Sequence, residues 1–92
     1  MTTSTQTIHT PPGHTIHQWR ATHGPSRLCR SNTGTLQIWH RFGSVGWMHL
    51  ADVDTSGARP QIQTVDSWIN HPWPYPIDLA HREVTHAIDL GL

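Results

Sequence analysis

The chain has no lysine, and all six of its cationic side chains are arginine. It has a single cysteine, Cys29, which excludes an internal disulfide and agrees with a reducing compartment. No apolar run approaches the roughly 20 residues that span a bilayer, and the first residues lack the basic start and the apolar centre of a secretion signal. We therefore expect a cytoplasmic protein with no membrane partner.

Acidic residues are absent from residues 1–51, which contain four of the arginines. All six acids follow, beginning with Asp52, so the net charge of zero hides a basic first half and an acidic second half. Two interpretations fit this pattern. In the one we favour, the halves pack together and neutralise one another; in the other, a basic sheet face meets an acidic or phosphorylated partner.

The length of 92 residues suits one domain with one modest core. Residues 1–13 are rich in threonine, end in Pro11, Pro12 and Gly13, and have no periodicity that could bury a face. We predict a disordered N-terminal tail over residues 1–13 and a single α+β domain over residues 14–92.

Alternation of apolar and polar residues predicts a small antiparallel β-meander of four or five strands. The clearest strand covers residues 35–42, in which Leu36, Ile38, His40 and Phe42 alternate with polar or aromatic neighbours. Burial on this inner face should oppose protonation of the His40 ring. The other strands are expected over residues 14–22, 27–31, 47–53 and 61–65, with a turn signal at His23–Ser26 between the first two.

Helical segments are expected after the sheet. Asp66 and Ser67 can cap a short helical turn that stops before Pro72, and Pro76 is placed to open a longer helix that runs to about Leu90. The apolar stripe of that helix comprises Ile77, Ala80, Val84 and Ile88. The predicted fold class is therefore α+β, a small antiparallel meander covered by a C-terminal amphipathic helix.

Nine histidines invite a metal-site interpretation, but their spacing does not support one. His81 and His86 are five positions apart, one too many for the HExxH motif, and would diverge by roughly 140° on a helix. Cys29, between Arg27 and Arg30, is the best nucleophile candidate, yet isolated cysteines are more often small buried hydrophobes. We assign no catalytic residue, no metal and no cofactor.

Tryptophan and arginine are the residues most enriched at the energetic centres of protein interfaces, and this chain has five tryptophans and six arginines. We expect Trp19 and Trp68 to fill the core. A three-residue hairpin loop at Ser44–Gly46 would gather Leu36, Ile38, Phe42, Met48 and Leu50 into the core. The opposite face would then contain the predicted partner-binding residues Trp39, Arg41, Trp47 and His49.

The function we expect is that of a small, non-enzymatic protein-binding module, such as a phage or mobile-element accessory protein that occupies the surface of a host protein. One alternative is a nucleic-acid-binding protein that uses the basic first half, where Trp19 precedes Arg20 and Trp39 lies near Arg41. A second alternative is a small metal-independent nuclease that uses histidine and arginine. The sequence does not indicate an oligomeric state.

Overall fold

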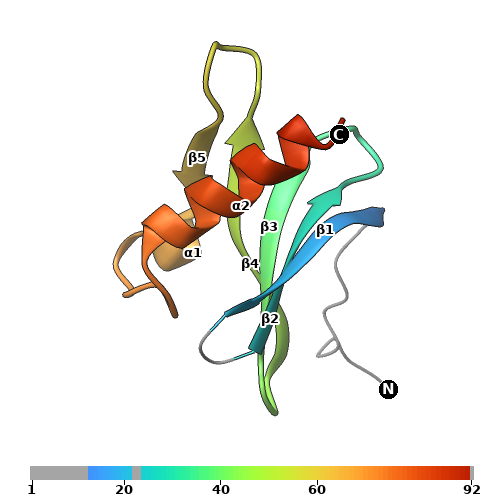
Figure 1. Cartoon of the computed structure of the whole chain (residues 1–92). Helices are drawn as coiled ribbons and strands as arrows, with labels where there is room; N and C mark the ends of the chain where they lie inside the picture. Colours follow the sequence, from blue (N-terminus) through green and yellow to red (C-terminus); the bar gives the residue numbers. More distant parts are fainter. Residues whose placement is uncertain (1–12, 22–23, 92) are drawn as a thin grey trace.

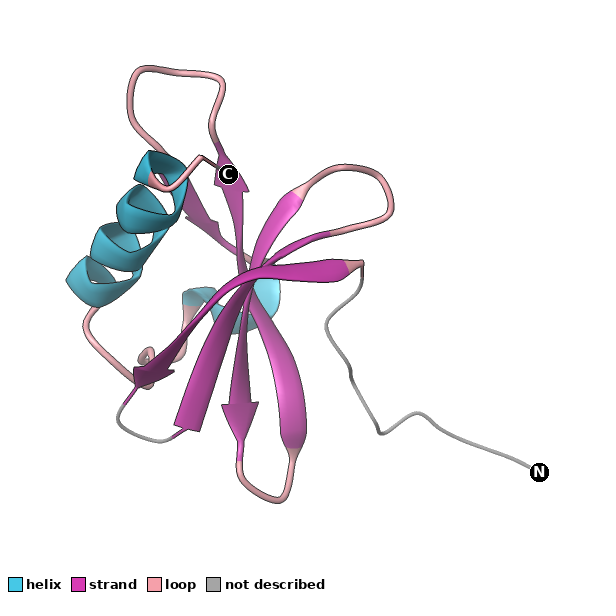
Figure 2. Ribbon diagram, turned by 45° about the vertical axis from the view of Figure 1, so that its right-hand side comes forward, coloured by secondary structure: helices cyan, strands magenta, loops and turns pink. Residues whose placement is uncertain are grey.

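A five-stranded antiparallel sheet and two helices make up the protein, which is represented by a computed structural model that describes residues 13–21 and 24–91. The strands are β1 (His14–Ala21), β2 (Gly24–Arg30), β3 (Leu36–Phe42), β4 (Gly46–Asp54) and β5 (Gln61–Thr64), and they pair in sequence order. They are followed by α1 (Asp66–Ile69) and α2 (Ile77–Asp89). Helix α2 crosses one face of the twisted sheet (Figures 1 and 2). The predicted α+β meander with a C-terminal helix is confirmed.

The predicted tail and membrane properties can be compared with the structure only in part. Residues 1–12 lie outside the described residues, and Gly13 is a bend that precedes β1. Neither helix in residues 13–21 and 24–91 has both the length and the apolar character that crossing a bilayer requires.

The turn between β1 and β2 is shorter than the sequence indicated. Ala21 pairs with Gly24, so only residues 22 and 23, which lie outside the described residues, separate the two strands. The predicted turn at His23–Ser26 is therefore wrong, because Pro25 and Ser26 already belong to β2. Gly24 has a φ of +137°, a conformation open to glycine, and this lets the chain reverse before the proline.

The hairpin between β3 and β4 begins one residue earlier than predicted. Phe42 pairs with Gly46, and the Val45 N–H donates to the Phe42 carbonyl over 2.7 Å, so the three loop residues are 43–45 and not Ser44–Gly46. Glycines flank this turn with φ values of +37° and +99°, at Gly43 and Gly46. The shift leaves the predicted faces unchanged, because the paired residues keep the same alternation.

A β-bulge in β4 was not foreseen. Trp39 pairs with His49 whereas Ile38 pairs with Ala51, which leaves Leu50 as an extra residue on β4. The bulge turns Ala51 into the core together with Leu50, and both are fully buried. Of the predicted core residues, Leu36, Ile38 and Leu50 are buried, Phe42 packs against the core with partial exposure, and Met48 is half-buried.

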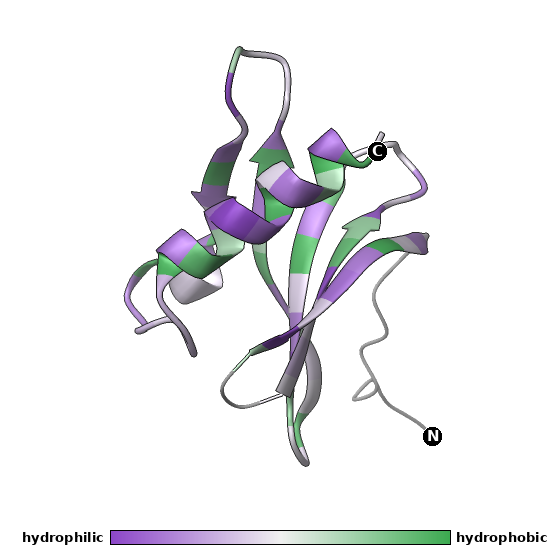
Figure 3. Ribbon diagram, in the orientation of Figure 1, coloured by the Kyte–Doolittle hydropathy of each residue, from purple (hydrophilic) through white to green (hydrophobic). Residues whose placement is uncertain are grey.

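Helix α2 covers the inner face of the sheet through a narrow stripe of small side chains. Ala80, Val84 and Ala87 are buried, and hydrophilic and hydrophobic residues alternate along the helix (Figure 3). The helix follows Pro76 as predicted, but Ile77 is 39% exposed, because the buried stripe begins one turn later. The predicted capping of α1 is also wrong, since Asp66 is already its first residue and no side chain caps it.

Aromatic rings fill the inner face beside α2. Tyr75 is buried and makes ring contacts with Trp19, His40 and Trp73 at centroid distances of 6.5, 5.5 and 5.7 Å. The predicted core positions of Trp19 and His40 are confirmed, and His40 Nδ1 lies 2.6 Å from the Ser26 hydroxyl. That burial opposes protonation of His40 stays a prediction.

Burial of Tyr75 should make the fold sensitive to alkali. Desolvation raises the pKa of this phenol to about 12, against an opposing effect of the Ser26 hydroxyl. The unfolded chain loses the same proton near pH 10, so ionisation stabilises the unfolded state first. We expect the free energy of unfolding to fall by up to about 3 kcal/mol as the pH rises from 10 to 12.

Urea denaturation at intervals across this pH range measures the effect, and Tyr75→Phe is the matched variant because it keeps the ring. In the substituted protein the free energy of unfolding should fall much less between pH 10 and pH 12. An equally steep decline in both proteins would show that Tyr75 is not the group responsible.

Candidate partner-binding face

The face of the sheet turned away from α2 presents aromatic and cationic side chains, and we call it the outer face. Arg41 pairs with Trp47, and Trp39 pairs with His49. The register therefore brings the four predicted partner-binding residues together on adjacent strands, and none of them is buried. Their role in binding stays a prediction.

Strands β1 and β2 extend this face with residues that the sequence analysis did not place on it. Arg27 pairs with Trp39 on one side and with Gln18 on the other. Arg20, two residues after Gln18, points to the same face because side chains alternate along a strand. The outer face is thus defined by Arg20, Arg27, Trp39, Arg41, Trp47 and His49.

Trp39 and His49 form a stacked cross-strand pair whose ring centroids are 5.1 Å apart, with an interplanar angle of 10°. The Trp39 indole N–H donates to the Gln37 side-chain oxygen over 3.0 Å. His49 Nε2 lies 3.1 Å from the Ala51 carbonyl oxygen and 2.8 Å from a carboxylate oxygen of Asp52. A carbonyl can only accept, so Nε2 carries the hydrogen and both rings are held in one orientation.

Arg27 and Trp47 form a cation–π contact that spans β3. The central carbon of the guanidinium lies 4.4 Å from the centroid of the Trp47 ring. The Arg27 Nε–H donates to the Gln18 side-chain oxygen over 2.7 Å. The ring contact and this hydrogen bond together restrict the plane of the guanidinium, and within the described residues its two terminal NH2 groups donate to no hydrogen bond.

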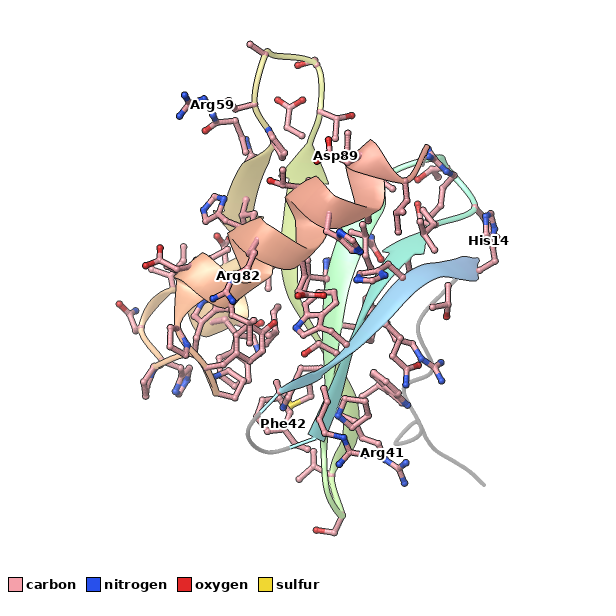
Figure 4. All side chains as sticks on the ribbon, viewed as in Figure 1. His14, Arg41, Phe42, Arg59, Arg82 and Asp89 are labelled. Atoms are coloured by element: carbon pink, nitrogen blue, oxygen red, sulfur yellow. The ribbon has the colours of Figure 1, made fainter. Side chains whose placement is uncertain are left out.

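The arginines of the outer face are not neutralised by the acidic half of the chain. In residues 13–21 and 24–91 the ion pairs are His17–Glu83 and His49–Asp52, and neither involves an arginine. Figure 4 shows Arg41 at the lower end of the sheet, away from Asp89 on α2. Both ion pairs nevertheless join the first half of the chain to the second, so the expectation that the halves pack together and neutralise one another stays a prediction.

The other chemical candidates lie elsewhere in the structure. Cys29 is buried, and desolvation raises the pKa of its thiol despite the opposing effects of Thr15 and Arg27, so it is a thiol and not a thiolate at neutral pH. His17 Nε2 lies 2.9 Å from a Glu83 carboxylate oxygen, and this link between β1 and α2 was missed in the sequence. Across the described ranges, no three histidine, cysteine or acidic side chains are grouped as metal ligands.

The sequence placed four of the six residues of the outer face there but not Arg20 and Arg27. Alternation placed Trp39, Arg41, Trp47 and His49 on one side of their hairpin. A hairpin-type loop was also expected at residues 32–34, and the observed pairing of Arg30 with Leu36 agrees with it, but this register was not used to extend the face to Arg27. Comparisons of the chain with protein-family models, with curated proteins and with solved structures give no match.

The two classes of tryptophan should differ in their effect on stability. Trp39→Ala removes one stacked pair outside the core and should cost about 1 kcal/mol. Trp19→Ala should cost about 3 to 5 kcal/mol, because it opens a cavity beneath α2. Urea denaturation of both variants measures the difference, and a cost for Trp39→Ala equal to that for Trp19→Ala would place Trp39 in the core.

Proposed function

We propose that the protein is a small non-enzymatic protein-binding module whose partner docks on the outer face. The observation that supports this proposal is the pairing of Trp39 with His49 and of Arg41 with Trp47 on the sheet face that α2 leaves uncovered. An accessory protein of a phage or mobile element that acts in the cytoplasm by covering a host protein surface would have these properties.

The outer face is already ordered in the free protein. The stacking of Trp39 on His49 and of Arg27 on Trp47 restricts side chains that would otherwise lose rotamer freedom on binding. Each such side chain that is held in advance lowers the entropic cost of association by about 0.5 to 1.5 kcal/mol. A small face can then bind through a few central anchors, and tryptophan and arginine are the residues that most often act as such anchors.

The number of cations on the outer face favours a protein partner over a nucleic acid. The face has three arginines, at positions 20, 27 and 41. Counterion release from three phosphate contacts gives a salt dependence with a slope of only about −2 on a single strand. The net charge of zero gives no long-range attraction either. Three charges suffice at a protein interface, where most of the binding energy comes from buried anchors.

Affinity capture with immobilised protein tests the proposal. We expect Trp39→Ala and Arg41→Ala to reduce partner capture from a lysate of the source cells by at least about tenfold, as loss of a hot-spot residue does. Arg82→Ala is the matched control, because Arg82 is exposed on α2 and lies away from Arg41 (Figure 4). All three proteins should retain the wild-type circular dichroism spectrum.

Nuclease treatment of the lysate separates the two macromolecular classes. Capture of a defined protein that survives nuclease and is lost in both outer-face variants supports the proposal. Recovery of nucleic acid that disappears on nuclease treatment would support the alternative of a nucleic-acid-binding protein. Undiminished capture by Trp39→Ala and Arg41→Ala would remove the outer face as the binding site.

A further inference from the structure

We infer that the partner presents an acidic surface to the outer face and that Arg27 is the residue that recognises its carboxylates. The inference rests on the proposed function, to which it adds the chemistry of the partner and a binding residue. Three properties of the outer face support it: its charge, the order of its side chains and the cost of burying an arginine.

The arginines of the outer face form no ion pair with a carboxylate in the described part of the chain. Arg20 and Arg41 are exposed, and Arg27 is half-buried. The acid nearest in register is Asp52, which pairs with Gln37, and its carboxylate is already engaged by His49. A partner that covers this face therefore meets cations whose charge is uncompensated.

Covering these arginines with a neutral surface would be unfavourable. Removing an ion from water is unfavourable unless opposite charge and hydrogen bonds replace the lost hydration. The two flanking tryptophans lower the effective dielectric further once a partner is seated, which strengthens any attraction to an anion there. A stable complex thus requires anionic groups opposite the arginines, and the anionic groups of unmodified protein side chains at neutral pH are the carboxylates of Asp and Glu.

Arg27 differs from the other two arginines because its guanidinium is held in place. Trp47 supports one face of the group at 4.4 Å, and Gln18 accepts from Nε at 2.7 Å. The terminal NH2 groups of any guanidinium form a planar fork whose spacing suits the two oxygens of a carboxylate. Lysine would supply the charge but not the fork, which makes a substitution between the two informative.

Peptides of defined charge test the chemistry directly. We would titrate the 15N-labelled 92-residue chain with the 12-residue peptides (Glu-Ala)6, (Gln-Ala)6 and (Lys-Ala)6, and with a 12-nucleotide oligothymidylate. The signals to follow are the indole N–H groups of Trp39 and Trp47 and the Nε–H of Arg27. We expect (Glu-Ala)6 to shift these signals, and the Gln and Lys peptides to leave them unchanged at the same concentration.

Three results would overturn the inference. Equal shifts with (Gln-Ala)6 would show that charge does not determine binding. Shifts at lower concentration with oligothymidylate than with (Glu-Ala)6 would show that phosphate, and hence a nucleic acid, is the preferred ligand. An absence of shifts with (Glu-Ala)6 at millimolar concentration would also count against an acidic partner.

Variants of Arg27 test its role as the recognition residue. Arg27→Gln should weaken (Glu-Ala)6 binding by at least about tenfold, as loss of a hydrogen bond to a charged group does. Arg27→Lys should weaken it nearly as much, because the charge remains and the fork is lost. Arg82→Gln on α2 removes the same charge outside the face and should bind like the wild type. If Arg27→Lys binds as strongly as the wild type, Arg27 contributes only its charge and the planar guanidinium is not required.

The same variants separate this inference from the proposed function. In the lysate capture, loss of binding in Trp39→Ala together with full binding in Arg27→Gln would leave the protein-binding function standing and refute recognition by Arg27. Full binding in both variants would refute the function and the inference together.

Discussion

The pairing of β3 with β4 determines both faces of the sheet. The outer face is set by the pairing of Trp39 with His49 and of Arg41 with Trp47. The bulge at Leu50 brings Ala51 opposite Ile38, so that Ala51 lies on the inner face. A slip of one residue in this register would exchange the faces, exposing apolar side chains and burying arginine. The core, the surface on which α2 packs and the candidate binding face therefore depend on the same set of cross-strand contacts.

The sheet separates only part of the charge pattern. Arg20, Arg27 and Arg41 lie on the outer face, whereas Asp78 and Asp89 are exposed on α2 across the sheet. Asp52 is an exception, because it pairs with Gln37 and lies on the outer face beside His49. The arginines are in excess on the outer face and dominate the local field there.

The features that the sequence predicted are those that depend on short-range periodicity. Alternation over residues 35–42 and 47–53 identified the central hairpin and the face of each side chain, and Pro76 marked the start of α2. The bulge at Leu50 was not predictable, because an extra residue in a strand changes no local composition. Arg27 was missed because its neighbours on the outer face come from three other strands, Gln18 on β1, Trp39 on β3 and Trp47 on β4, so its surroundings depend on several registers at once.

Energetics explain how a chain of this size can place two of its five tryptophans outside the core. Stacked and cation–π pairs on an exposed face contribute about 0.5 to 1.5 kcal/mol each, whereas a buried aromatic such as Trp19 contributes several. The pairs of Trp39 with His49 and of Arg27 with Trp47 are therefore a minor part of the stability of the fold. Their principal physical effect is to fix the orientation of the rings and of one guanidinium. Side-chain order of this kind lowers the cost of association, which is why the outer face is better suited to binding than to holding the domain together.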